Sequence, residues 1–228
     1  MRLRFFGFLI AAPLAQLSAS AQQPGGVPDM QAIALGLGVK CEFCHTGPRG
    51  AETGTANAPS KMAVARAMIA MTRDLNARVS EATGKPPADA TQVTCVTCHR
   101  GVTIPGQLSD IVAKTALQES PDAAVAQYRD LRQRYYGGQS YDFREETLLE
   151  AAQRVVRINP PASIPLLRLN LEYYPQSVRS YIQIAYAYTR KLDDEAAIAA
   201  LEKALEIEPE NGVVKGQLEQ LKSYRRKK

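Results

Sequence analysis

Two short stretches of the same pattern decide this fold: Cys41–His45, which reads CEFCH, and Cys95–His99, which reads CVTCH. Between them they use all four cysteines and both histidines of the chain. In each stretch, two thiols that lie two residues apart can bond covalently to the vinyl groups of a haem. The histidine that follows directly then lies under the porphyrin as an iron ligand. The pattern therefore predicts two covalently bound haem c groups, held by Cys41, Cys44, His45, Cys95, Cys98 and His99.

Three other uses of paired cysteines are open. The two pairs together could bind one structural zinc ion. Each pair could instead be a redox disulfide of the thioredoxin kind or a plain structural disulfide. A redox disulfide is typical of a βαβ context, which the sequence does not show. Only haem attachment explains why a histidine directly follows the second cysteine in both stretches, so we favour haem.

Residues 1–21 have the pattern of a cleaved signal peptide. Two arginines precede an apolar run from Phe5 to Leu17, and Ala19–Ala21 supplies a cleavage site of the A-x-A kind. The run is short for a membrane span and contains Pro13, which favours cleavage over an uncleaved anchor. No other stretch predicts a membrane span. We therefore expect a periplasmic protein that is soluble or peripherally attached to the membrane.

The charge balance does not indicate nucleic-acid binding. The formal net charge of the chain is +5, and removal of Arg2 and Arg4 with the signal peptide leaves +3. Haem propionates would bring this value near zero. The basic cluster at Arg225–Lys228 is typical of a solvated tail. We expect no nucleic-acid partner.

The first half of the mature chain, residues 22–118, is predicted to be a small cytochrome domain of short helices and loops. A helix is expected over 30–36, and another over 108–117. The clearest helix covers 61–79 and is followed by a loop over 80–90. Its apolar residues recur on one stripe, formed by Val64, Met68, Met71 and Leu75.

The second half of the chain reads as wholly helical and contains a repeat. Residues 119–143 are predicted as a linking helix and turn. Pro175 and Pro209 lie 34 residues apart, and numbering one unit from Val178 places alanines at repeat positions 8, 20 and 27. This pattern resembles the tetratricopeptide repeat, in which small residues let two antiparallel helices approach. We therefore predict helical repeats with a capping helix over 144–228, the first unit (144–177) being degenerate.

A haem with only the histidine of its CxxCH stretch as a ligand has an open sixth site, and no histidine remains to fill either one. A methionine thioether is the natural candidate, and it raises the reduction potential relative to a second imidazole. Met30 precedes the first CxxCH stretch, whereas Met68 and Met71 lie on the apolar stripe before the second. Each of these methionines could instead be a packing residue.

The residues around both haem stretches carry a family resemblance. The run from Ala65 to Asn76, followed by Val93 to Gly101, resembles the multihaem cytochrome subunit of photosynthetic reaction centres. In that family each haem unit is a helix, a turn and then CxxCH, with a methionine of the preceding helix as the usual sixth ligand. The resemblance implies that Met30 pairs with His45 and Met68 with His99, Met71 being the alternative to Met68. The family's subunit has four haems, whereas this sequence has two CxxCH stretches.

These observations predict an all-α protein with a small dihaem cytochrome c domain followed by a TPR-like helical-repeat domain. The expected function is electron transfer between periplasmic or membrane redox partners, such as a membrane electron-transfer complex. A peroxidase-like haem enzyme with one open iron site and a redox-sensing interaction scaffold are the alternatives. The repeats either bind a protein partner or stabilise the cytochrome half. Three arginines either neutralise haem propionates or are solvated surface: Arg66, Arg73 and Arg100.

Overall fold

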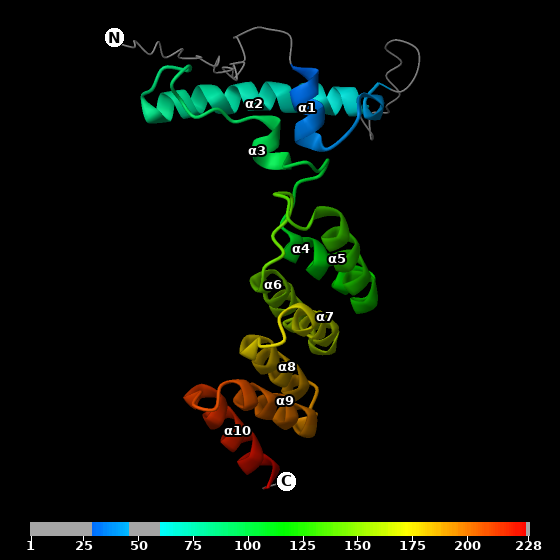
Figure 1. Cartoon of the computed structure of the whole chain (residues 1–228), viewed down its shortest axis with the longest axis vertical. Coiled ribbons are helices and arrows are strands. Elements are labelled where there is room, and N and C mark those ends of the chain that lie inside the picture. Colours follow the sequence, from blue (N-terminus) through cyan, green and yellow to red (C-terminus); the bar gives the residue numbers. More distant parts are fainter. Residues whose placement is uncertain (1–28, 46–59, 227–228) are drawn as a thin grey trace, which may run out of the picture. The chain divides into compact units, whose positions relative to one another are not determined.

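The computed structural model describes residues 29–45 and 60–226. The predicted signal peptide, residues 1–21, lies outside them. Within the described residues the chain has ten α-helices, one 3-10 helix and no strand (Figure 1), which confirms the predicted all-α class. The chain divides into two compact units. The first holds the residues up to Ala34 and Cys41–Thr94, and the second holds Leu35–Lys40 and the residues from Cys95 onward.

The first unit is dominated by one long helix. Helix α1 (Met30–Leu37) begins in this unit, and the 3-10 helix η1 (Cys41–Phe43) and helix α2 (Lys61–Thr83) follow. Ser60 caps α2, since its side chain accepts a hydrogen bond from Ala63 N at 3.1 Å. The helix is four residues longer than the 61–79 that the sequence predicted. It ends at Gly84, whose φ of 64° is left-handed, because Ser80 alone does not stop a helix.

Helix α2 buries none of its 23 residues against other protein atoms. Among the described residues of the first unit, Ala90 is the one buried hydrophobic residue. A helix of a globular protein ordinarily covers its apolar stripe with a neighbouring element. The described residues of this unit, 29–34, 41–45 and 60–94, therefore form almost no core of their own.

The second unit is a stack of helices that pack in chain order. Each of α6 to α9 contacts the helix that follows it, and α4 packs on both α5 and α6. Figure 1 shows this succession from α4 to α10. Its members are α3 (Cys95–His99), α4 (Leu108–Gln118), α5 (Pro121–Tyr135), α6 (Glu145–Val156), α7 (Pro160–Tyr173), α8 (Val178–Arg190), α9 (Asp194–Ile207) and α10 (Gly212–Arg225).

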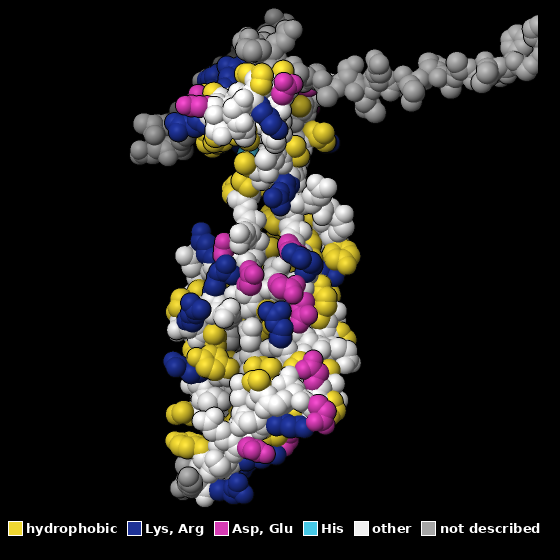
Figure 2. Space-filling model, turned by 90° about the vertical axis from the view of Figure 1, so that its left-hand side faces the viewer, with side chains coloured by type: hydrophobic (Ala, Val, Ile, Leu, Met, Phe, Trp, Pro, Cys, Tyr) yellow, Lys and Arg dark blue, Asp and Glu magenta, His cyan; other side chains and the backbone are white. Residues whose placement is uncertain are grey.

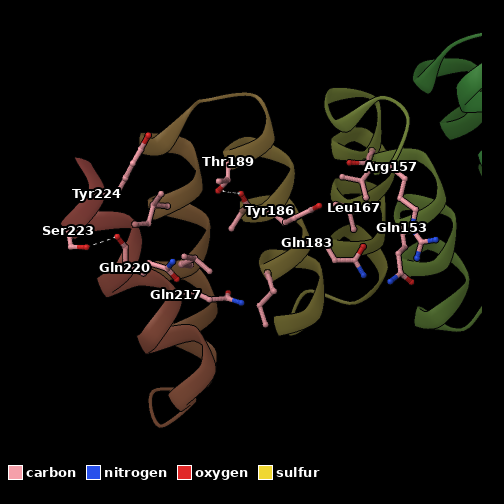
Figure 3. A pocket seen from close by; sticks show the side chains of 16 residues that line it. Gln153, Arg157, Leu167, Gln183, Tyr186, Thr189, Gln217, Gln220, Ser223 and Tyr224 are labelled. Carbon is pink, nitrogen blue, oxygen red and sulfur yellow. Dashed lines mark hydrogen bonds between the residues drawn. The ribbon is translucent and has the colours of Figure 1, made fainter. Parts of the chain in front are cut away.

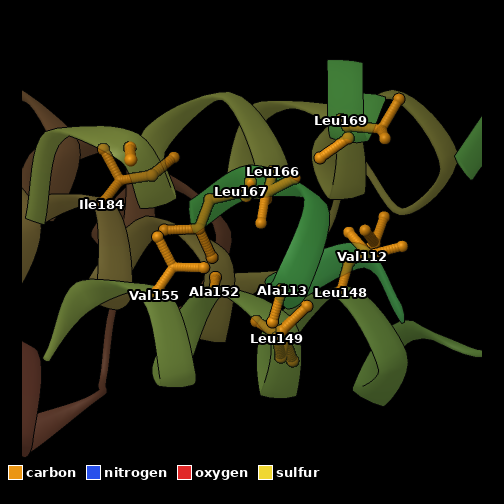
Figure 4. Close-up of a cluster of buried hydrophobic side chains, with 14 of the residues drawn as sticks. Val112, Ala113, Leu148, Leu149, Ala152, Val155, Leu166, Leu167, Leu169 and Ile184 are labelled. Atoms are coloured by element: carbon orange, nitrogen blue, oxygen red, sulfur yellow. The ribbon is translucent and has the colours of Figure 1, made fainter. Parts of the chain in front are cut away.

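One hydrophobic core runs through α4 to α10. Leu148 of α6 and Leu166 of α7 have no exposed surface, and Figure 4 shows them among leucines and valines of neighbouring helices. Complete burial of one such side chain stabilises the fold by roughly 1.5–3 kcal/mol. Val112 of α4 and Val214 of α10 belong to the same core. This part of the chain is therefore held together by its own side chains.

The buried small residues explain how the repeats pack. Ala185, Ala197 and Ala204 occupy repeat positions 8, 20 and 27 and are 3%, 0% and 0% exposed, so α8 and α9 approach closely there. In the degenerate unit, Ser163 and Asn170 are also fully buried. Asn170 donates from Nδ2 to Ser180 Oγ at 2.9 Å. Polar side chains thus replace alanines in the first unit without opening the helix interface.

Helix α4 contributes Leu108 and Val112 to the core of the repeats, although the sequence placed it at the end of the cytochrome domain. The predicted limits of the domains, at residues 118 and 143, stay predictions. The two compact units meet along the chain at three points, the last of them between Thr94 and Cys95. The first CxxCH stretch therefore belongs to the unit with α2, and the second belongs to the unit with the repeats.

Candidate haem sites

The first CxxCH stretch forms a single tight turn. The backbone N–H groups of Cys44 and His45 both donate to Cys41 O, at 3.3 and 3.1 Å. This turn keeps both thiols and the histidine within one short segment, as attachment to one porphyrin requires. The ammonium of Lys61, the first residue of α2, lies 3.8 Å from the centre of the Phe43 ring, a cation–π contact that ties the turn to α2.

Met30, the predicted sixth ligand for the first haem, is the first residue of α1. The Asp29 side chain caps this helix by accepting hydrogen bonds from Gln31 N at 2.9 Å and Ala32 N at 3.1 Å. Met30 is 50% exposed. The Met30 side chain is therefore not packed inside a protein core.

The second CxxCH stretch is helix α3, and its histidine is held in one orientation. His99 Nδ1 lies 2.9 Å from Val102 O. A carbonyl oxygen can only accept, so the imidazole donates from Nδ1, and in the neutral ring the lone pair then lies on Nε2. Metal-bound histidines usually have this outer hydrogen bond, which fixes the tautomer and increases the basicity of the ring. This hydrogen bond therefore fixes the orientation of the His99 ring and directs Nε2 away from Val102.

The turn after His99, residues Arg100–Val102, is fixed from several sides, and we call it the His99 turn. Arg100 has a φ of 50° and Gly101 a φ of 85°, so two successive residues are left-handed. Gly101 N donates to Gly36 O at 2.8 Å. From the other direction, Ser140 Oγ donates to Arg100 O at 2.6 Å. This turn places the Val102 carbonyl oxygen beside His99 Nδ1.

The apolar stripe of α2 is open to solvent. Val64, Met68, Met71 and Leu75 are 41%, 42%, 47% and 37% exposed, in agreement with a helix that has no buried residue. A contiguous exposed apolar stripe on a small protein marks a surface that something else covers. Two of its four side chains are thioethers. The stripe is an exposed apolar surface that contains two potential metal-binding thioethers.

Asn76 clamps α2 to the segment that precedes the second haem stretch. Its amide donates to Val93 O at 2.9 Å and accepts from Val93 N at 2.7 Å. Both backbone groups of Val93 are satisfied by one side chain, as they would be in a sheet. Asn76 was not predicted as a site residue, because a polar residue beside an apolar stripe gives no sign of a partner 17 residues away.

The four cysteines are free thiols, so neither pair forms a disulfide. Burial raises the pKa of the Cys95 thiol, and the neighbouring Cys98 adds to this effect. Within the part of the chain that the structure describes, no three His, Cys, Asp or Glu side chains gather as a site for a bare metal ion. The free thiols of Cys95 and Cys98 beside an oriented imidazole fit a covalently attached haem.

The repeats contain a groove of about 960 Å³ between α6, α8 and α10. Figure 3 shows side chains from these helices lining one continuous face. Gln183 and Gln217 lie 34 residues apart and occupy the same repeat position. Arg157 is the charged residue of the lining, which includes four glutamines, Gln153, Gln183, Gln217 and Gln220. Amide side chains can donate and accept, so this face suits the backbone of a protein partner.

Surface charges on the repeats are mixed in sign. Figure 2 shows basic and acidic side chains interspersed over the visible face. Several are paired, as in Arg129–Glu172 at 2.7 Å, Arg154–Asp110 at 3.1 Å and Lys222–Glu202 at 2.7 Å. This face therefore shows no broad basic surface of the kind that binds nucleic acid.

Comparisons with known proteins identify two parts of the chain. Residues 30–167, more than half of the chain, match the family described as the photosynthetic reaction centre cytochrome C subunit. Residues 178–211 match the tetratricopeptide repeat, the same 34 residues that the numbering from Val178 gives. Both predicted resemblances are thus confirmed. A search of curated proteins found no match.

Proposed function

The chain belongs to the family of the photosynthetic reaction centre cytochrome C subunit, and from this premise we propose that it is an exported dihaem c-type cytochrome. It carries electrons one at a time between redox partner proteins. Membership in the family implies covalently bound haem c and a role in electron transfer. The finer statements, namely two haems, their ligands and export, are our proposal.

The hydrogen bond between His99 Nδ1 and Val102 O is the observation that carries the proposal. Because Nδ1 is used in this bond, Nε2 is the ring nitrogen that can bind iron. His99 directly follows Cys98, as the iron ligand does in the CxxCH pattern. The same pattern recurs at Cys41–His45. Cys41, Cys44, Cys95 and Cys98 are the proposed attachment points, and His45 and His99 the proposed axial ligands.

Met30 and Met68 are the proposed sixth ligands, with Met71 as the alternative to Met68. Met68 and Met71 lie three residues apart on one face of α2 and are similarly exposed. When bound, haem supplies one-electron chemistry at its iron. The chain itself attaches the porphyrin, orients His99 through Val102, and offers thioethers where water would otherwise reach the metal. Six-coordinate sites of this kind favour electron transfer over a peroxidase-like reaction.

Export follows from residues 1–21, which read as a cleaved signal peptide. No helix in residues 29–45 and 60–226 is long and apolar enough to cross a bilayer. We propose a periplasmic location, with redox partner proteins that include components of a membrane electron-transfer complex.

The experiment is a determination of haem content and ligation in the purified protein. We expect a mass increase of two haems and, in the ferric form, the weak long-wavelength absorption band of thioether-ligated haem c. Met30→Ala and Met68→Ala should each remove part of this band, whereas Met71→Ala should not. Persistence of the whole band in the double variant Met30→Ala/Met68→Ala would contradict the ligand assignment. Bound zinc without haem would overturn the proposal entirely.

The groove of the repeats favours a second role, the recruitment of a protein partner. Gln183→Ala combined with Gln217→Ala should slow electron exchange with a partner that docks there and leave both reduction potentials unchanged. Substitution of two exposed residues outside the groove, Glu172→Ala and Glu206→Ala, is the control. If the groove variant and the control exchange electrons at equal rates, the repeats only stabilise the protein and do not recruit a partner through this groove.

A further inference from the structure

The His99 turn is held by a residue from the segment between α5 and α6, 40 residues further along the chain. Ser140 lies in the connection between α5, which ends at Tyr135, and α6, which begins at Glu145. Its hydroxyl donates to Arg100 O at 2.6 Å. Both residues belong to the second compact unit. The contact therefore connects the segment after the second haem stretch to the core of the repeats.

The connection that presents Ser140 is anchored in that core. The Tyr141 ring packs edge-on against Tyr135, with ring centres 5.3 Å apart. Phe143 is 6% exposed and packs edge-on against the fully buried Tyr128. The Phe143 carbonyl accepts hydrogen bonds from Tyr174 Oη at 2.8 Å and Arg132 Nη1 at 3.3 Å. Ser140 is thus attached to a rigid support rather than to a free loop.

The segment that Ser140 holds needs external support. Arg100 has a φ of 50°, a left-handed conformation that residues other than glycine adopt rarely and at a cost. Its neighbour Gly101 is tied to Gly36 O, and the Ser140 bond holds the carbonyl between these two left-handed residues. Both contacts lie one or two residues from Val102, whose carbonyl accepts from His99 Nδ1 at 2.9 Å.

We propose that Ser140 is a positioning residue for His99, through which the repeats set the reduction potential of the second haem. The inference rests on the proposed function. A firm hydrogen bond from Nδ1 makes the imidazole a stronger donor to iron, which stabilises the ferric state and lowers the potential. Loosening of the His99 turn weakens this bond and raises the potential of that haem alone.

The test compares Ser140→Ala with Ser140→Thr in the full-length holoprotein. Ser223→Ala is the matched control, because Ser223 Oγ also donates to a backbone carbonyl of the repeats, Gln220 O, at 2.8 Å. Partial loss of one neutral hydrogen bond corresponds to roughly a threefold change in an equilibrium constant. At about 59 mV per tenfold for one electron, Ser140→Ala should raise one of the two potentials by about 30 mV.

A second readout follows the turn itself. Backbone amide hydrogen exchange of residues 99–106 should be faster in Ser140→Ala than in the wild type, because the turn opens more often. Ser140→Thr keeps a hydroxyl and should restore both the potential and the slow exchange. Ser223→Ala should change neither.

The outcomes separate this inference from the proposed function. A protein without haem would refute the proposed function. A dihaem protein in which Ser140→Ala moves neither potential, moves both equally or lowers one would refute the positioning role and leave the proposed function intact. An equal shift in Ser140→Ala and Ser140→Thr would also refute it, since the hydroxyl would then be irrelevant.

Discussion

Gly38→Ala tests the close approach on which the His99 turn depends. Gly38 has a φ of 64°, and a Cβ built on it would overlap Gly101 O and lie 2.8 Å from Gly101 C. Real Cβ atoms essentially never come within 3.0 Å of such atoms. The neighbouring atoms are backbone, so no side chain can swing aside. The substitution must push the two segments apart.

The expected cost combines three contributions. A left-handed alanine costs about 1–2 kcal/mol relative to glycine. Overpacking against backbone costs about 1–3 kcal/mol. Separation of the segments also removes the hydrogen bond between Gly101 N and Gly36 O, worth about 1 kcal/mol. Gly38→Ala should therefore reduce the free energy of unfolding by about 3–6 kcal/mol.

Two other glycines isolate the effect of the overlap. Gly137, in the same compact unit, has a φ of 82° and nothing within 4 Å of a Cβ placed on it, and Gly84 has the same φ of 64° in equally open space. Their alanine variants carry the backbone penalty alone, about 1–2 kcal/mol. Urea denaturation of the holoproteins, followed by circular dichroism and by haem absorption, measures all three. A difference between Gly38→Ala and Gly137→Ala of less than about 1 kcal/mol, the worth of one hydrogen bond, would refute the close approach.

Further predictions concern the clamp, the core and the alkaline limit of stability. Asn76→Ala removes both hydrogen bonds to Val93 and should cost about 1–3 kcal/mol with faster exchange of the Val93 amide, whereas Asp74→Ala on the exposed side of α2 should change neither. Leu166→Ala, at a fully buried position, should destabilise the repeats by about 2–5 kcal/mol in thermal unfolding; Ile158→Ala, at a position 72% exposed, should change the free energy of unfolding by less than about 0.5 kcal/mol. Burial raises the pKa of Tyr128 from 10.0 to about 12, against the opposing charge of Arg132. Between about pH 10 and about pH 12, the Tyr128 hydroxyl therefore keeps its proton in the folded state and loses it in the unfolded state. The free energy of unfolding should fall as the pH rises through this range. Tyr128→Phe should show a smaller fall in denaturation titrations, and an equal fall would contradict the assignment.

Local patterns in the sequence predicted most of the helices. The stripe that begins at Val64 predicted α2, and the 34-residue spacing predicted α8 and α9 with their buried alanines. These features repeat every few residues or in every unit, so they are visible without knowledge of the tertiary structure. The C-terminal end of α2 was wrong by four residues because Ser80 is compatible with both a helix and a loop.

The contacts that hold the second site could not be predicted in this way. Ser140 meets Arg100 across 40 residues, and Asn76 meets Val93 across 17. Neither pair has a spacing or a composition that distinguishes it from ordinary polar residues. The apolar spacing also does not distinguish Met68 from Met71, because both lie on the same exposed stripe. Pairing of distant backbone and side-chain groups is decided by the fold as a whole.

The uneven distribution of buried residues has a consequence for the order in which this protein is assembled. The repeats enclose a complete core, so they can fold before any cofactor arrives. No residue of helix α2 is fully buried, and its apolar stripe contributes hydrophobic stabilisation only when it is covered. Before haem is attached, the chain would then have folded repeats and a weakly supported helix α2. Proteases should cut such a chain first around α2. Chains with attached haem should be degraded more slowly than chains without it.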